Sequence, residues 1–296
     1  MSSSFPALAV VPIRYSRSRL TEQDERSIDA YAAANVYAAA GVPFTVSEPR
    51  LDEARRVDDE PTNLGALGGA IATIVAEARA ERRPVLMTGG DCNHITGVVG
   101  GLQDAHGPDA RIGLVWFDAH GDFNTPRTTL SGMLGGMPVA VAAGLCFPQW
   151  RAGSHIAAPI PTDRIVLVDV RNLDAPEEQL IRATDAVIAA PATGFPGADL
   201  AESIAALAAK VDYIYLHIDS DILDERYVPN HGTKEPNGPD MQQVLDAVEK
   251  VMATGKVAAY AVVSVYGTGP GSEVCVPSGV ALIEGGLRRW AQHGSA

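Results

Sequence analysis

Three side chains that commonly bind metal ions alternate along one short segment of the sequence. Asp118, His120 and Asp122 stand at positions i, i+2 and i+4, and in an extended chain they point to the same side. Oxygen and imidazole ligands together suit a divalent transition metal such as Mn²⁺. The alternative is a polar loop whose acids have no common role. The segment directly follows an apolar run at residues 112–117. Because ligand sites of α/β sheets lie beyond strand ends, a metal site is the better interpretation.

A second pair of carboxylates follows another apolar run. Asp219 and Asp221 come directly after residues 213–218 and stand two positions apart, so they also share one side of an extended chain. By itself this pair fits an ordinary polar loop. Four Asp side chains and one His at two strand ends of one sheet, however, would repel strongly unless a cation lay between them. Carboxylates that can bridge two ions predict a binuclear site that activates water.

A third strand end carries the sequence GGDCNH at residues 89–94. Its two glycines permit a tight turn from a strand into a helix. Cys92 has two interpretations. It can be a small buried hydrophobic residue, which is the usual role of a free cysteine, or a third ligand beyond a strand end.

The elements that must position these side chains are indicated by hydrophobic runs. Short apolar runs alternate with Ala-rich helical runs over the whole length, which predicts a parallel sheet covered by helices on both faces. Several runs are continuously apolar, as strands buried on both faces should be. We find no linker, repeat or low-complexity block, so we expect one domain over residues 1–296. The expected strands are residues 8–13, 43–46, 84–88, 112–117, 164–170, 186–189, 213–218 and 258–265, and the expected helices include residues 21–40, 63–82, 199–210 and 241–253.

The composition narrows the class of protein and its partners. Hydrophobic residues make up 46% of the 296-residue chain and charged residues 20%, which is ordinary for a globular protein. The 36 acidic residues outnumber the 23 basic ones and give a net charge of −13, which argues against nucleic acids and anionic membranes as partners. The three cysteines form no disulfide framework, and we find neither a signal peptide nor a membrane-spanning run. We therefore expect a cytoplasmic protein with a small-molecule substrate.

Together these motifs resemble the arginase–agmatinase–formimidoylglutamase family, the ureohydrolases. The similarity extends from about residue 84 to about residue 270 and includes GGD at 89–91, DAHGD at 118–122, NTP at 124–126 and DSD at 219–221. The resemblance implies a three-layer α/β/α fold with a mostly parallel sheet of about eight strands. It also implies two divalent metal ions, most often Mn²⁺, and hydrolysis of a guanidino or formimino C–N bond in a linear amidine. Since family members are often trimers or hexamers, a homo-oligomer is also expected.

Carried over position by position, the resemblance assigns ligands to both ions. Asp118 and Asp219 would bridge them. The remaining ligands would divide between the ions, with Cys92 and Asp122 on one and His120 and Asp221 on the other. A hydroxide shared between the ions would attack the amidine carbon. Asp122 and His120 are the expected catalytic residues, with Asp122 taking up the transferred proton.

The sequence departs from the family pattern at one of these ligands. Cys92 stands where the family ordinarily has a metal-binding His, and a thiolate is a softer ligand that suits Zn²⁺ better than Mn²⁺. His94, two residues further on, is the alternative ligand. A cysteine here resembles a hydroxyarginine-hydrolysing branch of the family, which also shares HGDFNTP at residues 120–126 and LGGM at 134–137.

Two further departures concern the substrate and the proton. Gly135 replaces a His that is credited with proton shuttling in arginases, so another route, such as bulk water, must serve. Ser264 falls where the family places the acid that grips the guanidinium, and the nearest acid is Glu273. A buried guanidinium without a carboxylate loses a charge-assisted pair. Plain arginine is therefore not the expected substrate.

Other positions favour an amino-acid-like substrate. Asn124, Thr129 and Ser131 match the positions that bind the substrate carboxylate in arginases, and Asp174 matches the acid that faces the α-amino group. Ser264 completes the expected substrate-binding set. The alternative for each is ordinary loop polarity, since such residues are common in turns.

Several conspicuous residues receive structural interpretations instead. His217 either lines the site or packs as a buried imidazole, and His231 is expected in a solvated turn or at a pocket rim. The glycines at 267, 269 and 271 form no phosphate loop, because no Lys-Ser/Thr follows and no helix is expected there. Cys146 and Cys275 have no partner spacing and are expected to be structural.

The leading hypothesis is a metal-dependent hydrolase of C–N bonds in linear, amidine-type substrates. The competing hypothesis is a catalytically degenerate family member that binds a metabolite or a partner chain. A third hypothesis is a hydrolase for a neutral substrate, such as a hydroxyguanidine or an acylated amidine, for which Ser264 need only form a hydrogen bond. The complete set of four Asp and His120 favours an active site, because nothing else explains keeping five costly ligands together.

Overall fold

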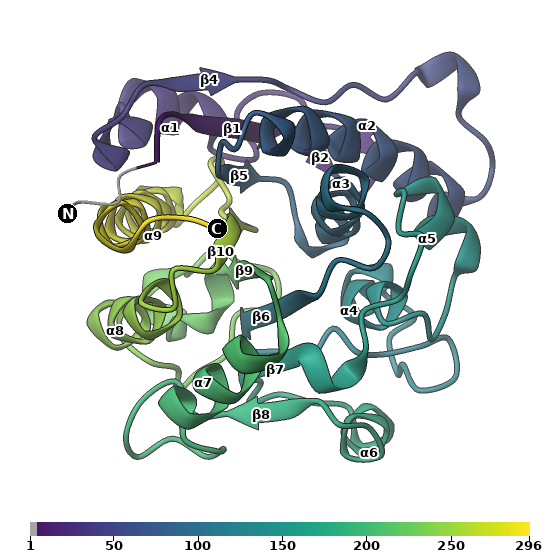
Figure 1. The fold of residues 1–296 in the computed structure, drawn as a ribbon, viewed down its shortest axis with the longest axis vertical. Coiled ribbons are helices and arrows are strands. Elements are labelled where there is room, and N and C mark those ends of the chain that lie inside the picture. The colour runs from purple at the N-terminus through teal and green to yellow at the C-terminus, as the bar shows by residue number, and fades with distance from the viewer. Residues whose placement is uncertain (1–4) are drawn as a thin grey trace.

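The structure is a computed structural model that describes residues 5–296 and arranges them around one eight-stranded sheet (Figure 1). The strand order is β4-β1-β5-β10-β9-β6-β7-β8, and all neighbours pair in parallel. The predicted parallel sheet and three-layer α/β/α fold are confirmed. The strands of this sheet are β1 (Leu8–Ile13), β4 (Phe44–Val46), β5 (Val85–Gly89), β6 (Ile112–Asp118), β7 (Ile165–Asp169), β8 (Val187–Ala189), β9 (Tyr213–Asp219) and β10 (Val257–Val263). A separate hairpin joins β2 (Tyr15–Ser16) to β3 (Arg19–Leu20).

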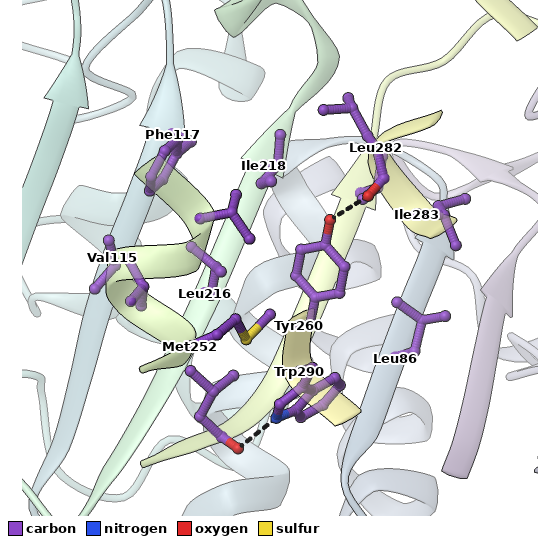
Figure 2. Close-up of a cluster of buried hydrophobic side chains, with 14 of the residues drawn as sticks. Leu86, Val115, Phe117, Leu216, Ile218, Met252, Tyr260, Leu282, Ile283 and Trp290 are labelled. Carbon is purple, nitrogen blue, oxygen red and sulfur yellow. Dashed lines mark hydrogen bonds between the residues drawn. The ribbon is translucent and has the colours of Figure 1, made fainter. Parts of the chain in front are cut away.

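Helices cover both faces of the sheet because alternate strand residues point to opposite sides. On β6, Val115 and Phe117 join the hydrophobic cluster under α1, α7, α8 and α9, whereas Leu114 and Trp116 join the cluster under α2, α3, α4 and α6. Figure 2 shows the first cluster, in which the Tyr260 hydroxyl donates to the Leu282 carbonyl at 2.9 Å. The helices are α1 (Ile28–Ala33), α2 (Glu60–Ala80), α3 (Ile95–His106), α4 (Pro138–Ala142), α5 (Pro148–Gly153), α6 (Ala175–Arg182), α7 (Leu200–Lys210), α8 (Met241–Met252) and α9 (Ser272–His293).

The helix predicted at residues 21–40 is wrong. The structure has turns up to Ser27, then the short α1, and then a 3₁₀ helix at Val36–Ala40. Ser27 and Asn35 adopt left-handed backbone conformations, with φ of 60° and 53°, and a continuous α-helix cannot pass through such residues. Thr21, the first residue of the predicted range, is not helical, and its hydroxyl donates to the Arg14 carbonyl at 2.7 Å.

The expectation that no helix follows the glycines at 267–271 is also wrong. Helix α9 begins at Ser272, directly after Gly271, whose φ is 96°. It continues for 22 residues although Pro277, its sixth residue, lies inside the helix and removes one backbone hydrogen bond. Burial of its apolar side against β10, with Leu282, Leu287 and Trp290 inaccessible to solvent, stabilises the helix.

Candidate metal centre

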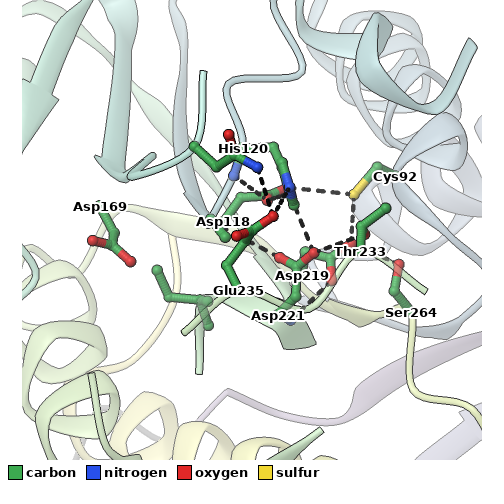
Figure 3. Close-up of polar contacts among 12 residues, drawn as sticks. Cys92, Asp118, His120, Asp169, Asp219, Asp221, Thr233, Glu235 and Ser264 are labelled. Atoms are coloured by element: carbon green, nitrogen blue, oxygen red, sulfur yellow. Dashed lines mark hydrogen bonds and ion pairs between the residues drawn. The ribbon is translucent and has the colours of Figure 1, made fainter. Parts of the chain in front are cut away.

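The predicted metal ligands meet at the carboxyl edge of the sheet. Asp118 is the last residue of β6 and Asp219 the last residue of β9, and these two strands are neighbours. Cys92 begins a 3₁₀ helix (Cys92–His94) that follows β5. Ser264 follows β10, which lies between β5 and β9. Because parallel strands end at the same edge, side chains far apart in sequence come together (Figure 3).

The ligand atoms of this cluster lie at coordination spacing. His120 Nδ1 is 3.2 Å from both Asp118 Oδ1 and Asp221 Oδ2. Cys92 Sγ is 2.9 Å from Asp219 Oδ2 and 3.7 Å from Asp118 Oδ2. Three groups of donor atoms each lie within 4.8 Å of one another, namely Cys92–Asp118–Asp122, Asp118–His120–Asp221 and Asp219–Asp221–His231. The donors therefore surround a small common volume.

The charges of the cluster are unbalanced without a cation. Burial and the neighbouring Asp221 and Asp122 raise the pKa of Asp118 well above its usual range, and burial does the same for the pKa of Asp122. Burial opposes the charge on His120, but hydrogen bonds to Asp118 and Asp221 overcome this and raise its pKa to about 12. Protons therefore occupy positions that a divalent cation would take, since metal binding releases protons from its ligands.

An unpartnered imidazole nitrogen is a second observation that fits a metal centre. His231 Nε2 is buried and has no hydrogen-bond partner among residues 5–296, although buried polar atoms are nearly always paired. Carboxylates with imidazole are a donor set for divalent transition metals. Each of the three overlapping groups of donor atoms could hold a metal ion.

The two candidate ligands after β5, Cys92 and His94, point in different directions. Cys92 Sγ faces the acids, and burial followed by the charge on Asp219 raises the pKa of its thiol well above the ordinary value. His94 faces away, because its Nδ1 accepts the Asp91 backbone N–H at 3.0 Å and its Nε2 lies 2.8 Å from the Arg17 carbonyl. Of these two side chains, only Cys92 faces the cluster of acids.

The segment after β6 is held by its own backbone and by α6. Asp118 Oδ1 accepts the His120 N–H at 2.7 Å, and Glu177 Oε1 accepts the Phe123 N–H at 2.8 Å. Asp122 adopts a left-handed conformation with φ of 47°, a strain that surrounding contacts must impose. Burial raises the pKa of Glu177 to about 7.

The segment after β9 is held by a distant arginine. Arg171 donates hydrogen bonds to five backbone carbonyls, those of Asp221 (3.0 Å), Ile222 (3.1 Å), Leu223 (3.2 Å), Glu235 (2.9 Å) and Pro236 (3.1 Å). It also forms an ion pair with the buried Asp169. These bonds fold residues 221–236 back over the cluster.

Because of this fold-back, His231 lies in the lining of the cavity at this site, which agrees with the expected pocket position, whereas the expected solvated turn is wrong. It is not solvated but only 3% exposed, with Nε2 3.2 Å from Asp219 Oδ1. Thr233 and Glu235 from the same segment also face the site (Figure 3). The sequence signal that could have found these residues is their place in the long loop that follows the second Asp pair.

Of the two interpretations made for His217, the structure supports the buried, packed imidazole, because His217 is not part of the cavity lining. Its ring stacks on Trp116 with centroids 3.9 Å apart, and it has no solvent exposure. Its Nε2 also lies 3.4 Å from Cys92 Sγ, and its Nδ1 lies 2.9 Å from the Tyr215 hydroxyl. His217 is therefore a packed imidazole that touches a candidate ligand from behind.

The cluster opens into a cavity of about 540 Å³ that holds most of the predicted substrate-binding residues. Asn124 Nδ2 donates to Asp174 Oδ2 at 3.2 Å on one wall. Thr129 lies outside the lining, and its hydroxyl accepts the Gly132 N–H at 3.0 Å. The lining includes Cys92, Asp118, His120, Asp122, Asn124, Ser131, Asp174, Asp219, Asp221 and Ser264.

Position 264 offers the cavity a hydroxyl and no acid. Ser264 Oγ donates to Asp219 Oδ2 at 2.6 Å. Glu273 is not its replacement, because it is exposed at the start of α9 and accepts the Gly271 N–H at 2.9 Å. Glu235 is an acid on the cavity wall, with Oε1 3.6 Å from His120 Nε2.

Comparison with known proteins defines the class. The model of the arginase family matches residues 12–268, so the chain belongs to this family. The arginase of Entamoeba histolytica is 31% identical over 206 residues, which are 69% of this chain and 67% of that relative.

Solved structures show the same fold. The crystal structure of Entamoeba histolytica arginase in complex with L-ornithine has a TM-score of 0.81 at 21% identity, and the match covers 97% of this chain and 99% of that one. Formimidoylglutamase from Bacillus subtilis has a TM-score of 0.71 at 14% identity, and the match covers 97% of this chain and 88% of that one. Within residues 5–296, no helix is long and apolar enough to cross a membrane.

Proposed function

We propose that this protein hydrolyses a C–N bond of a linear amidine or guanidine-type substrate with two divalent metal ions, Mn²⁺ being the preferred pair. The observation that carries the proposal is the convergence of four Asp and His120 in one cluster at the edge of a cavity. Asp118 and Asp219 are the proposed bridging ligands. The remaining proposed ligands are Cys92 and Asp122 for one ion and His120 and Asp221 for the other. The proposed setting is a cytoplasmic homo-oligomer without nucleic-acid or membrane partners.

The chain's own groups have distinct tasks in this reaction. Divalent cations in such sites supply a nucleophile by lowering the pKa of water. The carboxyl of Asp122, which belongs to the cluster and to the cavity lining, would take up and return a proton. Asp118 and Asp221 hold the His120 imidazole in place from two sides at 3.2 Å.

An amino-acid-like substrate is supported by other polar residues of the cavity lining. Asp174 offers a carboxylate to an α-ammonium group, and Asn124 and Ser131 offer hydrogen bonds to a carboxylate. Thr129, which orders the same turn through the Gly132 N–H, is proposed to act beside them. The L-ornithine in complex with the related Entamoeba arginase is an amino acid of this kind.

We further propose that the substrate is not plain arginine. The Ser264 hydroxyl cannot form an ion pair with a guanidinium, whereas a neutral hydroxyguanidine needs only a hydrogen bond there. The cysteine at position 92 and this serine together support a substrate of the Nω-hydroxyarginine type.

A binding protein without turnover is the second candidate. Three observations favour it: Cys92 replaces an imidazole, Gly135 cannot relay a proton, and Ser264 replaces an acid. Both candidates predict metal binding, so turnover must separate them.

A substrate panel tests the proposal. The Mn²⁺-loaded protein is incubated with arginine, Nω-hydroxyarginine, agmatine and formiminoglutamate, and the release of urea, hydroxyurea and ammonia is measured. We expect hydrolysis of Nω-hydroxyarginine in clear excess over arginine. Metal binding without turnover of any compound would support the binding protein, and efficient turnover of arginine would contradict the role given to Ser264.

A further inference from the structure

We infer that His231 is an additional metal ligand beside Asp219 and Asp221, a role that the carried-over family pattern gives to none of residues 222–236. The inference rests on the proposed metal-dependent function. It gives the cluster a second imidazole ligand besides His120, on the side of Asp219 and Asp221.

The first support is an unpartnered nitrogen inside the cluster. His231 is 3% exposed, and its Nε2 lies 3.2 Å from Asp219 Oδ1. Despite this short distance, Nε2 has no hydrogen-bond partner among residues 5–296. A buried imidazole nitrogen beside two carboxylates, without a hydrogen bond in line, has the placement of a ligand atom that awaits a cation.

The second support is the spacing between donor atoms. Two ligands at about 2.1 Å from one ion and at right angles to each other lie about 3 Å apart. The contact from His231 Nε2 to Asp219 Oδ1 measures 3.2 Å. His120 Nδ1 keeps the same 3.2 Å from Asp118 Oδ1 and from Asp221 Oδ2. The two imidazoles therefore approach the acids at equal spacing.

The third support is the way in which the His231 ring is held. Its Nδ1 lies 3.2 Å from the Thr233 hydroxyl, which donates to Asp221 Oδ2 at 3.1 Å. Tyr266 packs edge-on against the ring, with centroids 5.1 Å apart and an 83° angle. Metal-binding histidines are typically oriented by a hydrogen bond from the other ring nitrogen to such a partner.

Another proton position on the His231 ring fits the same contacts, and experiment must distinguish it from the ligand role. The Thr233 backbone N–H also lies 3.2 Å from Nδ1. If it donates there, the proton of a neutral His231 is on Nε2, and the residue is a hydrogen-bond donor to Asp219. A glutamine can replace such a donor but cannot replace an imidazole ligand, so the two roles predict different variants to be tolerated.

The test compares His231→Gln with His231→Ala in the full-length protein. Mn²⁺ affinity is measured by titration calorimetry, and imidazole nitrogen coupling to bound Mn²⁺ by electron spin-echo envelope modulation. We expect both variants to lose at least about tenfold in affinity at one of the two positions. Both should also lose the part of the nitrogen modulation that His231 contributes, while the part from His120 remains. Thr233→Val, which keeps the imidazole and removes its hydroxyl partner, should retain the nitrogen signal with weaker binding.

The outcomes are distinct. Wild-type affinity and full nitrogen modulation in His231→Gln would overturn the inference and assign His231 as a donor to Asp219. If the alanine variant does not fold, the glutamine variant still tests the inference. Its nitrogen modulation is then compared with that of the wild-type protein and of His120→Gln. If the wild-type protein binds no Mn²⁺, the proposed function itself fails together with this inference; if it binds Mn²⁺ and hydrolyses substrate regardless of residue 231, only the inference fails.

Discussion

Two segments supply most of the candidate metal ligands, and they are built in opposite ways. Residues 118–124, after β6, place Asp118, His120 and Asp122 at alternate positions and are fixed by short-range hydrogen bonds and by Glu177. Residues 219–236, after β9, leave the site after Asp221 and return ten residues later at His231. Their path is set by Arg171, which comes from the end of β7. Ligands in a segment fixed by local hydrogen bonds can be recognised in the sequence as a motif. A ligand such as His231, in a segment held by a distant residue, cannot.

The largest effect on metal binding is expected when one bridging acid is removed from either segment. Asp118→Ala and Asp219→Ala should each abolish stoichiometric binding of both ions, because each carboxylate is proposed to bridge them. Elemental analysis after dialysis against Mn²⁺ provides the measurement. Two ions retained in either variant would contradict bridging by that residue, and Asp163→Ala, in an exposed pair with Lys210, serves as the control.

Arg171→Met should break only the second segment. The substitution removes five hydrogen bonds and leaves the buried Asp169 carboxylate without its partner, which should cost about 3–5 kcal/mol in the free energy of unfolding. Urea unfolding in EDTA measures this loss. Arg182→Met, in an exposed helical pair with Glu178, should change stability by less than about 0.5 kcal/mol. Equal losses in both variants would show that Arg171 does not organise the segment.

Substitutions at position 264, beside Asp219, test how the substrate is selected. Ser264→Glu should raise the preference for arginine over Nω-hydroxyarginine, since a restored and desolvated ion pair is worth on the order of 3 kcal/mol. That energy corresponds to roughly a hundredfold in relative kcat/KM. Ser264→Gln, which adds the same bulk without charge, is the matched control. An equal change in both variants would mean that size rather than charge sets the preference.

Glu177→Gln tests the first segment through its pH dependence. The folded-state pKa of Glu177, about 7, lies above its ordinary value of 4.5, so the folded protein favours the protonated carboxyl. The stability contributed by this proton is present below pH 4.5 and is lost as the pH rises through 7.

Relative to Glu177→Gln, the metal-free wild-type protein should therefore lose roughly 2–3 kcal/mol of unfolding free energy between pH 4.5 and pH 8. Chemical unfolding of both proteins across this range gives the difference. Glu178→Gln, on the same helix but more exposed, should not reproduce it. If the difference in unfolding free energy between the two proteins does not vary with pH, Glu177 does not titrate as a buried carboxyl that holds the segment.

The same contrast explains how much the sequence could predict. The six inner strands were identifiable because strands buried on both faces leave continuous apolar runs, and the alternating acids at 118–122 follow one of them. The burial of His231 depends on Arg171, 60 residues earlier in the chain, and no local pattern encodes that contact. Likewise, the left-handed Ser27 and Asn35 interrupt a helix that composition alone favours, because tertiary contacts overrule local propensity.

The central claim is that a metal cluster at the sheet edge hydrolyses an amidine. Its most direct test follows hydroxyurea release from Nω-hydroxyarginine by protein that has been dialysed against EDTA and then titrated with Mn²⁺, with bound metal counted in the same samples. We predict that turnover is absent after EDTA and returns in proportion to occupancy, up to two ions per chain. Turnover that is independent of metal, or two bound ions without turnover of any amidine, would contradict the account.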